Sequence, residues 1–296
     1  MTTSSIARPG FAVPASTLPF LFILMWSSGY VVGKLALPHA GPFTLLLLRF
    51  ALAALVLLAI ALVTRAPWPA GWKPAAHLVV VGLLVQALQF SGLYTGLKLG
   101  VSAGVSALIV GTMPLFTALG ASVFLHETVS GRQWLGLAGG VAGVALVVAD
   151  RLGGASLLGL GALVLALAGI TLGTLYQKKF CADTDLRTGG FIQLAVASSV
   201  ALPLAWWVED FQVVWTPTLL LASSWLSIVN SIGAVSLLFL MMRKGQASQV
   251  ASLFYLVPGT TALMGFVILD ERLGAMTLAG FAVTAAAVHF CTRTTR

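Results

Sequence analysis

The sequence has very few charged side chains. Asp, Glu, Lys and Arg make up 8% of its 296 residues, whereas a soluble domain carries about 25%. The basic residues occur singly between apolar runs, so the net charge of +8 does not indicate a nucleic-acid partner. The mean hydropathy of +1.01 is typical of a chain that crosses a membrane many times and has the lipid bilayer as its main partner.

Carboxylates are scarcer still, and none falls in the middle of a predicted membrane span. The eight acids are Glu127, Asp150, Asp183, Asp185, Glu209, Asp210, Asp270 and Glu271. Carriers coupled to protons or sodium commonly keep an acid near the membrane centre, so the pattern favours a facilitator. Glu127 and Glu271 are expected to have a structural role at helix ends, each capping the N-terminus of the helix that follows it.

The side chains of metal, cofactor and nucleophile sites are also missing. Two cysteines and four widely spaced histidines form no ligand cluster, and the sequence has no phosphate-binding loop. Gly100–Gly104 matches the pattern of a nucleophile elbow, but it lies between two apolar runs and has no acid and histidine partners. We therefore expect no metal, no cofactor and no enzymatic activity.

The chain contains ten apolar runs, each about as long as the 20 residues that a helix needs to cross a bilayer. The predicted fold is all-α and integral to the membrane, after a cytoplasmic tail over residues 1–17. The predicted spans are 18–37, 43–64, 76–97, 101–125, 132–150, 155–177, 189–208, 217–241, 247–269 and 274–292.

An internal repeat divides the ten spans into two sets of five. The stretch from Leu97 to Gly136 returns from Met242 to Gly280, with a proline, a glutamate and a glycine matched at a shift of 144 residues: Pro114 with Pro258, Glu127 with Glu271, and Gly136 with Gly280. The predicted repeats are residues 18–150 and 151–296. Because five is odd, the second repeat is expected to be inverted, as in transporters that bind substrate near the midplane between their repeats.

The basic residues predict which side of the membrane the loops occupy. Eleven Lys and Arg residues fall on the side of the N-terminus and four or five on the other side. Cytoplasmic loops are the ones enriched in Lys and Arg. Both termini are therefore predicted to lie in the cytoplasm.

Polar side chains within predicted spans are candidates for a substrate cavity. Gln86 and Gln89 lie in the third span, and Asn230 and Ser231 lie in the eighth. Under the repeat alignment Gln86 answers to Ser231, so both repeats place polarity at one depth. Two interpretations remain open, because such groups either line a cavity or form hydrogen bonds between helices.

Aromatic side chains deep in the spans are candidates for the cavity walls. Trp26, Tyr30 and Tyr255 lie away from the predicted membrane interfaces. Tyr94 lies close to a predicted helix end, where tyrosines commonly act as interfacial anchors. The cavity is expected to be built from spans one, three, four, six, eight and nine.

Two prolines and one arginine are assigned to the framework. Pro114 and Pro258 are each predicted at a helix centre, where the missing N–H makes a kink or a hinge. Arg49, in the second span, is expected to have a structural role at a helix end, paired with a loop carboxylate or a helix C-terminus.

These features together resemble a known family. The segment MWSSGYVVGKLAL around Trp26, the arginine in LLLLRFALAAL and the doubled unit of small residues, proline, glutamate and glycine resemble the EamA-type branch of the drug/metabolite transporter superfamily. Among its members the chain looks most similar to the YddG-like aromatic amino-acid exporters. One departure is His126, where a glycine is common before the glutamate.

The resemblance implies a secondary transporter of the bacterial cytoplasmic membrane. Its implied substrates are amino acids or related small metabolites, exported by alternating access. Two alternatives stay open. Efflux of organic cations would use Trp and Tyr faces as cation sites, whereas an ion channel is disfavoured because no charged ring or carbonyl filter is present. The oligomeric state is not fixed by the sequence, and a monomer is compatible with it.

Overall fold

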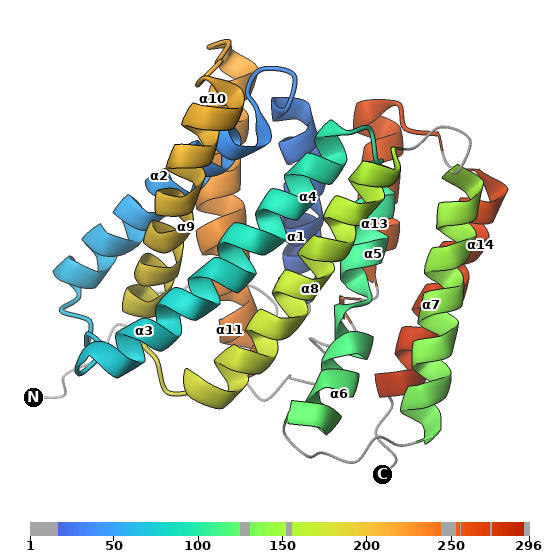
Figure 1. Cartoon of the computed structure of the whole chain (residues 1–296), viewed down its shortest axis with the longest axis horizontal. Coiled ribbons are helices and arrows are strands. Elements are labelled where there is room, and N and C mark those ends of the chain that lie inside the picture. The colour runs from blue at the N-terminus through green and yellow to red at the C-terminus, as the bar shows by residue number, and fades with distance from the viewer. Residues whose placement is uncertain are drawn as a thin grey trace, which may run out of the picture.

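A computed structural model describes residues 17–124, 131–151, 156–243, 253–254, 256–272 and 274–292 as a bundle of helices (Figure 1). The first repeat contains α1 Thr17–Ala36, α2 Pro42–Val63, α3 Trp72–Val81, the π-helix η1 Gly82–Leu88, α4 Gln89–Lys98, α5 Ala103–Gly111, α6 Met113–Phe124 and α7 Gly131–Arg151. The second repeat contains α8 Leu157–Phe180, α9 Leu186–Glu209, α10 Pro217–Trp225, the π-helix η2 Leu226–Ala234, α11 Val235–Arg243, α13 Leu256–Leu269 and α14 Ala275–Thr292.

Within the described residues, seven helical stretches are long and apolar enough to cross a membrane. Three shorter apolar helices accompany them, over Trp134–Leu146, Leu256–Leu269 and Ala275–Ala287. Each span predicted from the sequence overlaps one of these helices. The all-helical membrane fold is therefore confirmed, whereas ten complete spans in two inverted repeats stay a prediction. The predicted tail lies outside the described residues except for Thr17, which begins α1.

The third span of each repeat is interrupted by a π-helix that the sequence analysis did not predict. η1 separates α3 from α4, and η2 separates α10 from α11. A shift of 145 residues carries 82–88 onto 227–233, which lies within η2. π-helical turns are rare and often occur at functional sites. Their matched positions show that the repeat extends to local backbone geometry.

Pro114 lies near the middle of the apolar stretch Ala103–Gly120, as predicted, but at a break between two helices rather than inside one helix. α5 ends at Gly111 and α6 starts at Met113, which makes Pro114 the second residue of α6. The Thr112 N–H donates to the Ile109 carbonyl at 3.2 Å, which closes a tight turn. Pro258 is the third residue of α13. Proline is tolerated in the first turn because no N–H is needed there.

Helices of the same rank in the two repeats pack on each other. α2 packs on α9, α5 on α13, and α7 on α14. Figure 1 shows α7 and α14 side by side at one edge of the bundle and running in opposite directions. Small residues allow the close approach, since a Cβ on Gly143 would lie 2.8 Å from the carbonyl oxygen of Gly280. This antiparallel pairing is what inverted repeats would produce.

Candidate functional site

A buried arginine lies inside the bundle. Arg49 is the eighth residue of α2, and only 4% of its surface is exposed. Its Nε donates to the Ser231 hydroxyl at 2.9 Å, and its Nη1 donates to the Tyr94 hydroxyl at 2.7 Å. The guanidinium carbon is 4.3 Å from the centre of the Phe90 ring. α2, α4 and η2 therefore converge on one cation.

Arg49 does not have the partner that the sequence analysis expected. Within the described part of the chain it contacts two hydroxyls and aromatic rings, and forms no ion pair with a carboxylate. The expectation failed because it treated Arg49 as a helix-end residue, whereas the helix begins seven residues earlier, at Pro42. An ionised side chain inside a membrane is costly and usually marks a functional site.

The π-helix η2 supplies part of the surroundings of this cation. The Ser231 hydroxyl accepts from Arg49 and donates to the carbonyl of Leu226, five residues back. One turn earlier, the Ser227 hydroxyl lies 2.9 Å from the backbone carbonyl of Arg49. Both serines thus tie η2 to α2. The Ser231 side chain, which was predicted as a cavity candidate, therefore forms a hydrogen bond with Arg49.

Asn230 forms a hydrogen bond between helices, which is one of the two roles that the sequence leaves open for it. Its Nδ2 donates to the carbonyl of Met25 in α1 at 2.5 Å, which is a bridge between helices. Its Oδ1 is buried and has no hydrogen-bond partner among the residues that the structure describes. An unpaired buried acceptor costs free energy. This oxygen is therefore available to a donor that is brought into the bundle.

The two predicted glutamines show no such bridges. Gln86 lies in η1 and is half-buried, and Gln89 opens α4 with 4% of its surface exposed. Among the described residues, neither side chain has a hydrogen-bond partner. Their amides are on the same span as Tyr94, for which the sequence predicts an interfacial anchor. That interpretation is wrong, because Tyr94 is fully buried and bonded to Arg49.

The aromatic candidates separate into two groups. Tyr30 lies in α1 and is 6% exposed. The same helix passes close to Tyr94, because Gly33 of α1 packs against the Tyr94 ring. Trp26 instead packs against Phe22 and Phe254, with ring centres 5.4 and 5.2 Å away. Tyr255 lies outside the described residues.

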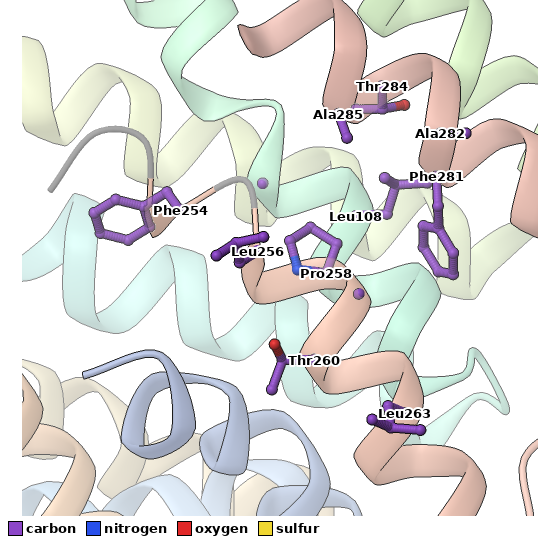
Figure 2. Close-up of a pocket in the computed structure, with 12 residues that line it drawn as sticks. Leu108, Phe254, Leu256, Pro258, Thr260, Leu263, Phe281, Ala282, Thr284 and Ala285 are labelled. Atoms are coloured by element: carbon purple, nitrogen blue, oxygen red, sulfur yellow. The ribbon is translucent and has the colours of Figure 1, made fainter. Parts of the chain in front are cut away.

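A cavity of about 460 Å³ lies beside Pro258, away from the arginine. Figure 2 shows its lining, which includes Leu108 from α5, Pro258 and Leu263 from α13, and Phe281 from α14. Of the described residues that were predicted to line a cavity or act as a hinge, it includes only Pro258. Its lining is mostly apolar, with Thr260 and Thr284 as the polar side chains and no charged one among the described residues. We therefore place the candidate site at Arg49.

Glu271 caps a helix, but not the one that the sequence analysis predicted. Its two carboxylate oxygens accept from the N–H of Ala103, the first residue of α5, at 2.9 and 3.0 Å. The expected partner is the start of α14, at Ala275, four residues further along the chain. Glu271 also forms an ion pair with Lys34 at 2.6 Å. Its counterpart Glu127 lies outside the described residues.

A helical membrane bundle with an internal repeat and a buried cation has the features of a membrane transporter. The profile of the EamA-like transporter family matches residues 14–149 and 157–293. The chain therefore belongs to the EamA-like transporter family, within the drug/metabolite transporter superfamily.

Proteins with similar sequences agree with this class. The chain is 28% identical to the uncharacterized transporter YvbV of Bacillus subtilis, over 90% of this chain and 87% of that protein. It is 27% identical to a probable amino-acid metabolite efflux pump of Salmonella typhimurium, over 92% of each chain. It is 25% identical to the uncharacterized inner membrane transporter YedA of Escherichia coli K12, over 83% of this chain and 80% of that protein.

A solved crystal structure shares the fold. The two chains superpose with a TM-score of 0.62 over 93% of this chain and 95% of the other, at 19% sequence identity. An identity this low shows the likeness of fold alone. The named relatives are transporters and pumps, so the expectation of a transport protein, integral to the membrane and without enzymatic activity, agrees with them.

Proposed function

We propose that this chain is a secondary transporter that exports amino acids or related small carboxylate metabolites by alternating access. The membrane would be the bacterial cytoplasmic membrane, with both termini in the cytoplasm. The observation that carries the proposal is the buried guanidinium of Arg49, which has only neutral partners among the described residues. A substrate carboxylate would supply the missing negative charge.

The chemistry of recognition is an exchange of hydrogen-bond partners. Arg49 now donates to two hydroxyls, and its planar guanidinium can donate two parallel hydrogen bonds to one carboxylate. The bonds to Ser231 and Tyr94 have one ionised partner, whereas a carboxylate adds the opposite charge and accepts two bonds from one group. A substrate carboxylate would therefore displace the two hydroxyls. The free Oδ1 of Asn230, on the residue next to Ser231, would accept from the substrate ammonium. Because Arg49 and Tyr94 are buried here, α1 or η2 has to move before substrate enters.

We infer that transport is facilitative. The acids whose side chains are described lie at helix ends or in loops: Asp183, Asp185, Glu209, Asp210, Asp270 and Glu271. None of these six is at mid-membrane, so this part of the chain offers no carboxylate for proton or sodium coupling. The name of one relative as an amino-acid metabolite efflux pump supports the direction and the substrate class. The finer likeness to YddG-like aromatic exporters is part of this proposal.

Uptake by reconstituted liposomes tests the proposal. We expect saturable uptake of labelled amino acids that is unchanged by an imposed pH gradient. The unlabelled amino acid should compete, whereas its methyl ester, which lacks the carboxylate, should compete at least tenfold less well. This difference corresponds to the loss of one charged hydrogen-bonding partner. Equal competition by the ester, or uptake that requires the gradient, would contradict the carboxylate site or the facilitative mechanism respectively.

Efflux of organic cations is the second candidate function. The aromatic cluster of Trp26, Phe22 and Phe254 favours it, because ring faces attract cations. The buried charge of Arg49 works against it by repulsion. Labelled tetraphenylphosphonium in the same liposomes separates the two, since its saturable uptake without any amino-acid uptake would replace the first candidate by the second.

A further inference from the structure

One polar contact joins three helices at the end of the bundle opposite to the end of α14 (Figure 1). Lys34, in the last turn of α1, donates from Nζ to Glu271 Oε1 at 2.6 Å and to the carbonyl of Val101 at 2.9 Å. Glu271 follows α13 and accepts from the N–H of Ala103 at the start of α5. We call the set Lys34, Glu271, Val101 and Ala103 the closing contact.

The closing contact is built more specifically than a surface ion pair. The side chain of Glu271 is only 8% exposed, and that of Lys34 is 24% exposed. The carboxylate lies at a helix N-terminus, where the free N–H and the dipole favour an anion. It also lies against Gly265, where an added Cβ would be 2.6 Å from Glu271 Oε2. A glycine therefore makes the space that the carboxylate occupies.

The contact crosses the boundary between the repeats. Lys34, Val101 and Ala103 belong to the first repeat, and Glu271 belongs to the second. α1, α5 and α13 are also the first, fourth and ninth of the predicted spans, which were expected to build the cavity. Separating the contact would therefore part the two repeats at one mouth of the bundle.

The physical chemistry of the contact suits reversible opening. Closed, it gains charge-assisted hydrogen bonds in a site that is largely shielded from water. Open, both ionic groups would be hydrated at the membrane surface, where exposed pairs contribute little. An apolar contact of the same size would expose hydrocarbon to water on opening. The polar contact thus permits two states of similar free energy.

We propose that the closing contact is the gate at this mouth of the transporter, and that transport requires it to break and re-form. The mouth is the outer one under the predicted orientation. The inference rests on the proposed alternating access, but the gate can be measured without substrate.

Cysteine labelling tests the gate. The background carries Cys181→Ser and Cys291→Ser, and Ala107→Cys places a thiol at a fully buried position one turn inside Ala103. A membrane-impermeant maleimide is added to two separate preparations of sealed vesicles, one for each orientation of the protein. A separate variant, Val214→Cys, marks the vesicles that expose this mouth, because Val214 is 61% exposed and follows α9 on the same side as the α1–α2 loop.

We expect Glu271→Gln and Lys34→Met to raise the labelling rate about tenfold or more, only in the vesicles that the marker identifies. That factor is what one lost charged hydrogen bond gives. Gly265→Ala should act in the same direction, although it keeps both charges. The matched control is Asp185→Asn, which breaks an ion pair of 2.7 Å within one helix start. Hydrogen bonds from Arg187 hold the pKa of Asp185 at about 2, so this pair is also charged at neutral pH.

Unchanged labelling in folded Glu271→Gln and Gly265→Ala proteins would overturn the gate. Folding is checked by helical circular dichroism and by a single peak in gel filtration. If Glu271→Gln does not fold, Glu271→Asp keeps the charge but shortens the reach, and the same increase is expected. Faster labelling in a protein that transports no amino acid would uphold the gate and reject the proposed substrate, so the two failures are distinguishable.

Discussion

Arg49→Gln is expected to reduce the initial rate of amino-acid uptake by about a hundredfold or more. The substitution removes the charge of Arg49, the one charge that the described residues place at the candidate site, and leaves Tyr94 and Ser231 without their donor. Truncating one member of a buried charged pair commonly costs about 2–5 kcal/mol, which corresponds to this loss when the partner is the substrate carboxylate. The measurement is uptake of a labelled amino acid into liposomes that contain equal amounts of folded protein.

Two further variants separate recognition from folding. Arg49→Lys keeps the charge but cannot donate two parallel hydrogen bonds, so an intermediate loss is expected. Arg187→Gln removes a partly exposed arginine at the start of α9, far along the chain from Arg49, and should leave uptake unchanged. Ligand should raise the melting temperature of the wild type but not of Arg49→Gln. If folded Arg49→Gln protein has the same KM as the wild type, Arg49 does not bind substrate and only holds α2 against η2.

Gly92→Ala is expected to destabilise the protein by about 2–3 kcal/mol, at the upper end of the usual cost of overpacking. Gly92 lies where α4 packs on α8, and an added Cβ would collide with the carbonyl oxygen of Ala162. That oxygen belongs to the backbone of α8 and cannot rotate away. The two helices would therefore have to separate. Thermal unfolding in detergent, followed by circular dichroism, measures the effect.

The matched control for Gly92→Ala lies on the facing helix. An added Cβ on Gly161 of α8 would meet no atom within 4 Å. Gly161→Ala should therefore leave the melting temperature unchanged or raise it slightly, since alanine has the higher helix propensity. Equal melting temperatures for the two variants would contradict the close approach of α4 and α8.

The apolar spans could be predicted because lipid leaves the backbone few options. Spanning segments must satisfy their own hydrogen bonds, so each apolar run of sufficient length becomes a helix. The run 217–241 is observed as α10, η2 and α11, over 217–243. The π-helix within it was not predicted, because a shift from i−4 to i−5 hydrogen bonds leaves no mark in hydropathy. Pro114 likewise showed that a break exists, but not that α6 begins there.

The contacts of the site could not be predicted from the sequence because the residues that form them are far apart along the chain. Glu271 bonds to Ala103, which is 168 residues away, whereas the prediction chose the adjacent helix. Arg49 and Ser231 are 182 residues apart. Tyr94 was misassigned because nearness to a helix end does not tell which face of the helix is buried. A signal was present in Tyr94 and Phe90, which are four residues apart and share one helix face.

The pairing of equal-rank helices has a consequence for how such a chain could arise. A surface that packs against its own counterpart is self-complementary, which is the property that a symmetric dimer requires. The second, fourth and fifth helices of one repeat already present such faces, in the pairs α2 with α9, α5 with α13 and α7 with α14. One repeat, made as a separate polypeptide and inserted in both orientations, would carry the contacts needed to hold a second copy. Gene fusion would then fix the ratio of the two orientations at one to one, and leave each copy free to diverge.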